Sequence, residues 1–203
     1  MTFYTRWILP PLIDLTMHQR QFDGYRRAVV PQACGRVLEI GVGSGLNLPL
    51  YGAAAEVVLG IDPSPELLGR ARRRAAASGV RAQMILGSAT EIPLAEASVD
   101  SVVMTWTLCS ISDPLKALRE IRRVLKPGGA LLFVEHGLSP EAAVARWQRR
   151  LTPTWRHIAG GCHLDRKMDD LIRSASFELT ALRTEYARGP RPMTYMYQGA
   201  ARR

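Results

Sequence analysis

The sequence predicts an α/β fold built on a parallel β-sheet. Short apolar segments alternate with segments of helical periodicity, and the first apolar segment runs directly into three glycines at alternate positions, Gly41, Gly43 and Gly45. Apolar runs without alternation are typical of strands buried on both faces, and strands that alternate with helices form parallel sheets. Glycines after such a strand allow a tight turn and close approach of a ligand. We therefore expect a small-molecule site at this edge of the sheet.

The elements before and after the glycines follow one another in a regular order. A helical pattern precedes the first strand, so residues 1–35 are expected to form a helical cap or lid. Pro65 and Gly79 mark the start and the stop of the next helix. Further strands and helices follow from the same patterns. Strands are expected at 37–40, 57–61, 81–86 and 98–105, and helices at 63–78 and 115–125.

The C-terminal third of the sequence is expected to complete the sheet. Residues 126–129, Lys-Pro-Gly-Gly, have the composition of a type II turn and lead into a fifth strand at 130–134. The last two strands are expected at 177–182 and 192–198, the second of them at an antiparallel edge or in a hairpin. A chain of 203 residues has room for one core, so we expect a single domain.

Composition and cysteine usage predict a protein of the reducing cytoplasm. No apolar run approaches the roughly 20 residues of a membrane span, and the N-terminus lacks the pattern of a cleaved leader. Cys34, Cys109 and Cys162 are odd in number and far apart, which fits neither a disulfide framework nor a C-x-x-C metal site. No metal is expected, and Cys109 is expected to act as a small buried apolar residue. Nothing in the sequence indicates an oligomeric state.

The formal net charge of +9 is concentrated near the ends of the chain. Residues 1–35, 36–139 and 140–203 carry net charges of +2, +1 and +6. Such a distribution suits an anionic membrane surface, an acidic substrate or nucleic acid. The alternative, a surface that is merely well solvated, has equal weight.

The glycine loop favours an adenosine-containing ligand over a dinucleotide. The dinucleotide fingerprint requires Gly or Ala at the position that Leu46 occupies. Asp62 lies 21 residues after Gly41, at the end of the second strand, where a carboxylate can accept hydrogen bonds from the hydroxyls of a ribose.

Five ordered motifs identify a family. They are Glu39 with the glycine loop, Asp62, the segment 87–94 (Gly-Ser-Ala-Thr-Glu-Ile-Pro-Leu), the segment 98–100 and the segment 125–129. Together they resemble the class I S-adenosylmethionine (SAM) methyltransferases of the methyltransferase type 11 group. The resemblance covers nearly the whole chain and implies a Rossmann-like seven-stranded sheet in the order 3-2-1-4-5-7-6, with strand 7 antiparallel and helices on both faces. It also implies SAM as cofactor and S-adenosylhomocysteine (SAH) as product.

The same resemblance implies a set of cofactor-binding residues. The glycines would approach the methionine part of SAM, Asp62 the ribose, and Glu39 the glycine loop or the methionyl amine. Ser88 stands where the family usually has an acid, so adenine recognition would rest on the Ser88 hydroxyl and on backbone groups near Ala89. The full expected set is Glu39, Gly41, Val42, Gly43, Gly45, Asn47, Asp62, Pro63, Ser88, Ala89 and Thr105.

A narrower resemblance concerns the methyl acceptor. The segments 108–111, 133–137, 153–155 and 161–166, together with Trp147, resemble the thiol methyltransferases called methyltransferase-like seven and bacterial relatives labelled phosphatidylethanolamine or quinone methyltransferases. This implies a small lipophilic acceptor, either a thiol or the amine of a phospholipid-like substrate, with residues 138–175 as the helical segment on the acceptor side. It also implies contact of the N-terminal segment with a membrane, at the inner face of the cytoplasmic membrane.

Methyl transfer from SAM is an in-line displacement that needs alignment more than acid–base chemistry. Trp106 and Thr107, at the end of the fourth strand, are expected to face the transferred methyl group. His136 or His163 could act as a general base, with a purely structural histidine as the alternative for each. The four tryptophans, Trp7 among them, predict either an aromatic acceptor pocket or simple packing of the caps.

Two other functions remain open from the sequence. One is an RNA or protein methyltransferase, which the charge favours; nucleic acid is the less expected partner, because the chain lacks interleaved basic and aromatic residues and the Asn/Asp-Pro-Pro-aromatic signature after the fourth strand. The other is a SAM-binding protein without catalysis.

Overall fold

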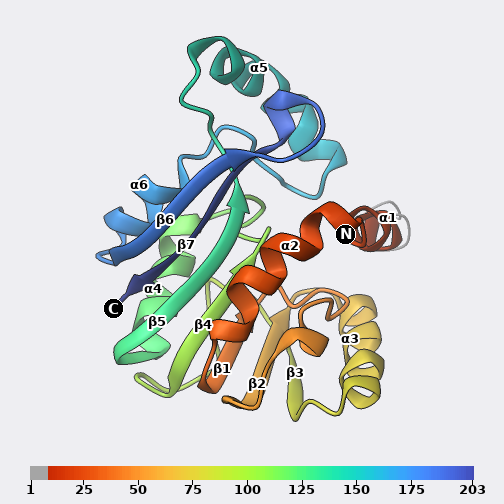
Figure 1. The fold of residues 1–203 in the computed structure, drawn as a ribbon, viewed down its shortest axis with the longest axis vertical. Helices are drawn as coiled ribbons and strands as arrows, with labels where there is room; N and C mark the ends of the chain where they lie inside the picture. Colours follow the sequence, from red (N-terminus) through yellow and green to blue (C-terminus); the bar gives the residue numbers. More distant parts are fainter. Residues whose placement is uncertain (1–8) are drawn as a thin grey trace.

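The computed structural model describes residues 9–203, and within them seven strands form one sheet in the order β3-β2-β1-β4-β5-β7-β6 (Figure 1). The five strands from β3 to β5 are parallel to one another, and β7 runs antiparallel to both β5 and β6. This is the expected order. The strands are β1 (Gly35–Ile40), β2 (Ala55–Asp62), β3 (Ala82–Leu86), β4 (Val99–Thr105), β5 (Leu125–His136), β6 (Glu178–Tyr186) and β7 (Tyr195–Arg202).

Helices cover both faces of the sheet (Figure 1). One apolar core lies under α4 and α6, and a second lies under α2, η2 and α3. The inner parallel strands β1, β2 and β4 are therefore largely buried on both faces, which accounts for their apolar sequences, whereas the edge strand β3 has no buried residue. The helices are α1 (Leu9–Met17), α2 (Arg20–Val29), η2 (Val30–Gln32), η3 (Leu48–Leu50), α3 (Pro65–Ser78), α4 (Pro114–Val124), α5 (Ala142–Ile158), α6 (Met168–Ser174) and η4 (Arg191–Met193).

Local sequence signals place the ends of α3. The Ser64 side chain caps its first turn by accepting a hydrogen bond from the Leu67 N–H at 3.2 Å, and Pro65 occupies the first helical position. Gly79 ends the helix in the left-handed conformation at φ +72°. Because α3 begins directly after β2, its N-terminus lies at the edge of the sheet where the glycine loop also lies.

Two strand predictions differ from the structure. β5 starts at Leu125 rather than Ala130, because the 126–129 segment forms a bulge inside the strand: Val99 pairs with Leu125, and Ser101 already pairs with Ala130. Gly128 in this bulge has φ +77°, as the second central position of a type II turn requires. The last strand, β7, does form a hairpin with β6, but it lies inside the sheet, and the edge position belongs to β6.

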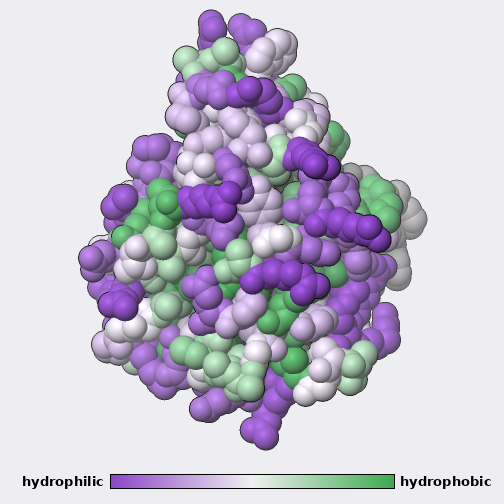
Figure 2. All heavy atoms as spheres, in the orientation of Figure 1, coloured by the Kyte–Doolittle hydropathy of each residue, from purple (hydrophilic) through white to green (hydrophobic). Residues whose placement is uncertain are grey.

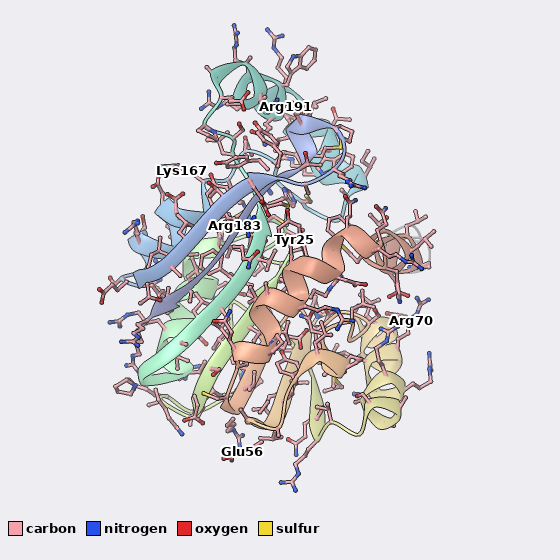
Figure 3. The ribbon with its side chains drawn as sticks, in the orientation of Figure 1. Tyr25, Glu56, Arg70, Lys167, Arg183 and Arg191 are labelled. Carbon is pink, nitrogen blue, oxygen red and sulfur yellow. The ribbon has the colours of Figure 1, made fainter. Side chains whose placement is uncertain are left out.

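The N-terminal helices lie against the rest of the fold at two places. Tyr25 of α2 lies beside Arg183 of β6 (Figure 3), and burial together with the nearby Glu185 carboxylate raises the pKa of Tyr25 to about 12. Asp14 of α1 forms an ion pair with Arg70 of α3 at 3.0 Å. The two helices therefore contact both β6 and α3, and they pass over the carboxyl ends of the strands, where the glycine loop lies.

Most of the face seen in Figure 2 is hydrophilic, with apolar residues in small separate groups, one of them over α1. Leu15 of α1 has 71% of its surface exposed, and Leu12 has 48%. Among the described residues no helix has the length and apolar character to cross a bilayer.

Candidate active site

A cleft of about 700 Å³ opens at the carboxyl ends of β1, β2 and β4. This is the point where the strand order reverses, and ligands of open α/β sheets bind there. Residues from six separate parts of the chain line it: the N-terminal helices, the glycine loop, the β2–α3 junction, the loop after β3, the loop after β4, and the end of α5. Of the residues expected to bind the cofactor, all but Gly45 line this cleft: Glu39, Gly41, Val42, Gly43, Asn47, Asp62, Pro63, Ser88, Ala89 and Thr105.

The start of the glycine loop is anchored to the end of β2. The N–H groups of Gly41 and Val42 both donate to the Ile61 carbonyl, at 2.9 and 3.2 Å. Gly41 has φ +66°, and a Cβ added there would lie 2.3 Å from the Thr107 Oγ1 atom. A side chain at this position would therefore collide with the loop after β4, and only glycine lets the two loops meet.

Gly45 serves packing rather than the cleft. It has φ +82°, and an added Cβ would lie 2.6 Å from a Leu48 side-chain carbon and 3.1 Å from the Ala71 backbone of α3. Gly45, which was expected to approach the methionine part of SAM, is not among the residues that line the cleft, and its Cβ position sets how closely the loop packs on α3. Leu46, which excluded the dinucleotide fingerprint, lines the cleft instead.

Glu39 is a fully buried carboxylate at the inner end of the cleft. Its two oxygens accept hydrogen bonds from the Asn47 amide at 3.0 Å and from the Tyr51 hydroxyl at 2.8 Å. Loss of hydration on burial raises its pKa to about 7, although both hydrogen bonds oppose that shift. The Asn47 amide also donates to the Thr105 hydroxyl at 3.0 Å, while the Asn47 Oδ1 has no partner among the described residues. The network therefore contains one acidic group, the Glu39 carboxyl, and one acceptor without a partner among the described residues, the Asn47 Oδ1.

Asp62 ties the glycine loop to the start of α3. Its Oδ2 accepts from the Gly43 N–H at 3.0 Å and its Oδ1 accepts from the Ser64 N–H at 2.8 Å. Burial raises the pKa of Asp62, and these two N–H groups oppose the rise. Each carboxylate oxygen retains one further lone pair, so the group can still accept hydrogen bonds from a ligand in the cleft.

The Ser88 hydroxyl is already engaged by its own turn. It lies 2.8 Å from the Thr90 hydroxyl and accepts from the Thr90 N–H at 3.2 Å. Ser88 and Ala89 both line the cleft, and Ala89 is buried there. At this end of the cleft, an adenine ring could form hydrogen bonds with backbone groups and with the Ser88 hydroxyl, which Thr90 already shares.

The loop after β4 is held by a buried acid. The Glu135 carboxylate accepts from the N–H groups of Thr107, Leu108 and Cys109, at 2.7, 2.9 and 3.3 Å. Burial raises the pKa of Glu135 well above its ordinary value in spite of these three donors. The loop therefore has one fixed shape, which the sequence did not indicate.

Trp106 begins this loop in an unusual backbone conformation, with φ +50°. Its ring meets Phe22 edge-on, with the ring centroids 5.1 Å apart, and the guanidinium of Arg26 lies 4.9 Å from the ring centroid. The Trp106 indole N–H has no partner among the described residues. Strained residues with unused polar groups cluster at functional sites, and both Trp106 and Thr107 line the cleft as expected.

The far wall of the cleft contains residues that sequence reasoning missed. They come from the N-terminal helices and from the end of α5, and their distance along the chain from the glycine loop conceals their place in the site. The place of the first group could have been anticipated, because residues 1–35 were expected to form a cap over the site. The residues are Asp14, Met17, Arg26, Arg156, His157, Gly160 and Gly161.

The expectation of an acceptor pocket built from several tryptophans is wrong for Trp147 and Trp155. Trp147 has 56% of its surface exposed on the outside of α5, and Trp155 packs against the core rather than lining the cleft. Trp7 lies outside the described residues. Of the three described tryptophans, Trp106 is the one that lines the cleft.

The two histidines that could act as bases lie behind the cleft wall, not in it. The Nε2 atom of His136 lies 3.0 Å from the Cys162 sulfur, and the Nδ1 atom of His163 lies 2.7 Å from the Gly161 carbonyl oxygen. Neither ring lines the cleft. Cys109 is buried, as expected, but it belongs to the same group of side chains as His136 and Cys162. A role for either histidine as general base stays a prediction.

Comparison with known proteins supports one family. Residues 38–133 match the family model described as a methyltransferase domain. Thiol S-methyltransferase TMT1B of Rattus norvegicus is 39% identical over 145 residues, which cover 70% of this chain and 59% of the relative. The Homo sapiens protein of the same name is 34% identical, covering 82% of this chain and 69% of that protein. The phosphatidylethanolamine N-methyltransferase of Cereibacter sphaeroides is 34% identical, covering 73% of both. The chain thus spans less than two thirds of the rat relative.

A solved structure shows the same fold. The S-adenosylmethionine dependent methyltransferase from Mesorhizobium loti matches with a TM-score of 0.67 at 18% identity, covering 92% of this chain and 99% of that chain. The site also fits SAM on its own terms. Gly41 and Gly43 line the cleft without side chains, a Cβ at Gly41 would collide with Thr107 of the facing loop, and the buried Asn47 Oδ1 has no partner among the described residues. Relatives, fold and cleft agree: the chain belongs to the class I SAM-dependent methyltransferases, and SAM is its cofactor.

Proposed function

We propose that this protein transfers the methyl group of SAM to the sulfur of a small lipophilic thiol. The observation that carries the proposal is the composition of one cleft. Its inner part holds the glycine loop and Asp62, and its outer part is walled by Trp106 and Ile111 from beyond β4 and by the end of α5. Cofactor and acceptor would thus meet at the end of β4.

SAM supplies a methyl group on a sulfonium, which is already a good leaving group. The chain's own residues would bind and align the reactants, and positioning of this kind can supply roughly 7 to 11 kcal/mol of barrier reduction. Asp62 would accept from the ribose hydroxyls with its remaining lone pairs, and Asn47 Oδ1 and Glu39 would receive the methionyl amine. Ser88 and Ala89 would border the adenine.

Trp106 and Thr107 would confine the reacting atoms and exclude water. The Thr107 hydroxyl donates within the fold, to the Ile40 and Thr105 carbonyls at 3.2 and 3.1 Å, so it offers the acceptor no proton. The wall built by Trp106 is apolar and fixed, which suits a lipophilic acceptor better than a flexible polar chain. The thiol itself is supported by the printed names of the rat and human relatives.

Transfer of labelled methyl from SAM to a panel of acceptors tests this proposal. The panel holds a lipophilic thiol, a phosphatidylethanolamine vesicle and total RNA, because the relative from Cereibacter sphaeroides is named for phosphatidylethanolamine and the charge favours RNA. We expect label in the thioether, identified by mass spectrometry. Label found only in the phospholipid or only in the RNA would identify that molecule, and not the thiol, as the acceptor. Label in no member of the panel would indicate a SAM-binding protein without this activity.

The Glu39 carboxylate predicts a pH dependence of cofactor binding. With a pKa of about 7, Glu39 is mostly neutral at pH 6 and mostly ionised at pH 7.5, whereas the amine of SAH carries a positive charge over most of this range. We therefore expect the affinity for SAH, measured by calorimetry, to rise about fivefold from pH 6 to 7.5. Glu39→Gln should bind more weakly at pH 7.5 and show no such rise. An equal rise in both proteins would assign the titration to another group.

Trp106→Ala should separate acceptor turnover from cofactor affinity. Removing the ring opens the acceptor wall, so kcat/KM for the thiol is expected to fall about tenfold or more, while SAH affinity changes by less than about threefold. Trp147→Ala removes an exposed tryptophan of α5 and should leave both quantities unchanged. Equal losses of turnover and SAH affinity in Trp106→Ala would contradict the assignment of this ring to the acceptor.

Membrane association stays a prediction. Leu12 and Leu15 are exposed on α1, and the N-terminal and C-terminal segments carry the excess positive charge. Such a surface would bind anionic headgroups at the inner face of the cytoplasmic membrane. Flotation with vesicles that contain anionic lipid, compared with neutral vesicles, measures it; equal recovery in both would count against it.

A further inference from the structure

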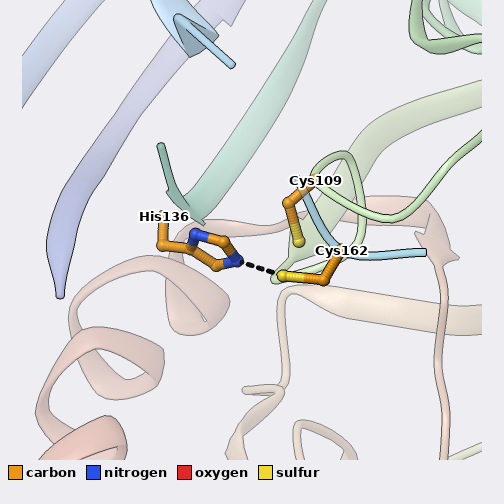
Figure 4. A group of neighbouring side chains, drawn as sticks. All are labelled: Cys109, His136 and Cys162. Carbon is orange, nitrogen blue, oxygen red and sulfur yellow. Dashed lines mark hydrogen bonds between the residues drawn. The ribbon is translucent and has the colours of Figure 1, made fainter. Parts of the chain in front are cut away.

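Three potential metal ligands from distant parts of the chain meet next to the cleft. Cys109 lies in the loop after β4, His136 is the last residue of β5, and Cys162 lies in the loop after α5 (Figure 4). The two sulfurs and a ring nitrogen all lie within 4.8 Å of one another, and the His136 Nε2 lies 3.0 Å from the Cys162 sulfur. Both cysteines are free and buried.

Further contacts hold these side chains in place. The Trp155 indole N–H donates to the Cys162 sulfur at 3.2 Å, and the Ser110 hydroxyl lies 3.5 Å from the Cys109 sulfur. The N–H of His163 donates to the Cys109 carbonyl at 2.9 Å, which ties the two cysteine loops together. Metal ligands are typically oriented by outer hydrogen bonds of this kind, which the two cysteines have, whereas the Nδ1 atom of His136 is buried without a partner among the described residues.

The donor set and its spacing match zinc. Two cysteine sulfurs and one imidazole nitrogen are ligands that Zn²⁺ prefers, and tetrahedral coordination would place them about 3.5 to 3.8 Å apart. The observed group spans 3.0 Å at its shortest contact and less than 4.8 Å overall, so shifts within about an ångström would complete the geometry. Zinc coordination accounts for all three side chains, whereas a disulfide between the two cysteines would not account for the contact of His136 with the Cys162 sulfur.

The group has three protein ligands, and its neighbours in the chain line the cleft. Ser110 follows Cys109, Gly161 precedes Cys162, and both belong to the cleft wall. Zinc sites with three protein ligands keep a fourth position for water or substrate. None of the three residues itself lines the cleft, so an acceptor would reach the group by way of Ser110 and Gly161.

We propose that Cys109, His136 and Cys162 bind one zinc ion and leave its fourth position to the thiolate of the acceptor. The role of the fourth position rests on the proposed function, whereas zinc binding does not. A thiol that coordinates zinc loses its proton, here to water. The sulfur–carbon bond of the thioether then forms as the carbon–sulfonium bond of SAM breaks, and that electron pair stays on the sulfur of SAH. The site thus supplies an activated nucleophile to a cleft whose lining includes His157 but neither His136 nor His163, the two histidines expected as bases.

Metal analysis of the untagged protein tests the first half. We expect about one zinc per chain in the wild type, and less than about a tenth of that in Cys109→Ser, Cys162→Ser and His136→Gln. Cys34→Ser is the matched control, because Cys34 is an exposed cysteine outside the group, and it should retain its zinc. SAH binding by calorimetry shows which variants remain folded. Zinc below a tenth per wild-type chain after growth with added zinc, or equal zinc in all variants, overturns the site.

Cobalt substitution keeps the test decisive if the variants unfold. The Co²⁺-loaded wild type should show the visible bands of tetrahedral thiolate coordination, and 2-mercaptoethanol added without SAM should change them. Bands of octahedral coordination would overturn the zinc site. Tetrahedral bands that do not change when the thiol is added would overturn the assignment of the fourth position to the acceptor. A thiol-responsive spectrum without thioether formation leaves the zinc site standing and removes the proposed function. Full thiol methylation by the metal-free protein leaves the proposed function standing and overturns the fourth-position assignment.

Discussion

Gly41→Ala is expected to weaken SAH binding by about a hundredfold or more. The new Cβ would lie 2.3 Å from the Thr107 Oγ1 and 2.5 Å from its Cγ2. The Thr107 side chain cannot rotate away without breaking its hydrogen bonds to the Ile40 and Thr105 carbonyls. Relief must therefore come from the backbone of the glycine loop or of the loop after β4, and both line the cleft.

Gly79→Ala is the matched control for this change. Gly79 has φ +72°, close to the +66° of Gly41, but a Cβ there meets no described atom within 4 Å. It therefore carries only the strain of the left-handed conformation, about 1 to 2 kcal/mol. We expect Gly79→Ala to lower the melting temperature while binding SAH like the wild type. Calorimetry measures both. Wild-type affinity in Gly41→Ala would show that the two loops do not meet as the structure has them.

Asp62→Ala is expected to cause a loss of similar size for a different reason. The alanine would leave the partly buried N–H groups of Gly43 and Ser64 without their acceptor, at a cost of up to roughly 1 kcal/mol each. It would also remove the acceptor for the ribose hydroxyls. We therefore expect SAH affinity to fall about a hundredfold or more, because a loss of 2.8 kcal/mol corresponds to roughly that factor.

Asp100→Ala is the control for Asp62→Ala. Asp100 lies near the amino end of β4 and bonds to Lys126 at 2.6 Å, away from the cleft. Its removal should cost stability without changing SAH affinity. Asp62→Asn serves if Asp62→Ala fails to fold, since the amide retains one acceptor oxygen and should bind with intermediate affinity. Unchanged affinity in Asp62→Asn and Asp62→Ala would remove Asp62 from the cofactor site.

The strand order was implied by the family resemblance, whereas most of the cofactor side of the cleft was predictable because its causes are local. The glycines directly follow a buried strand, and Asp62 ends the next one, so parallel pairing alone brings them together. Gly45 shows where this reasoning stops. Its spacing in the loop is the same as that of Gly41, but its Cβ position faces α3, and a sequence pattern does not say which neighbour a turn approaches.

The acceptor side was less predictable because its contacts join distant parts of the chain. Cys109, His136 and Cys162 show no metal-ligand spacing, yet the parallel strands bring the ends of β4 and β5 to one edge and α5 returns the chain to it. The same return places Arg156 and Gly160 in the cleft and Trp147 outside it. A helix of seventeen residues presents side chains in every direction, and its docking angle decides which of them face the site.

Calorimetric titration of SAH into the wild-type protein is the most direct measurement of the central claim, that the cleft between the glycine loop, Asp62 and Trp106 holds the methyl donor. The account predicts one site per chain, with affinity that falls in Gly41→Ala and Asp62→Ala and persists in Gly79→Ala and Asp100→Ala. Absence of binding to both SAH and SAM in the folded protein would contradict it, and so would binding that all four variants retain unchanged.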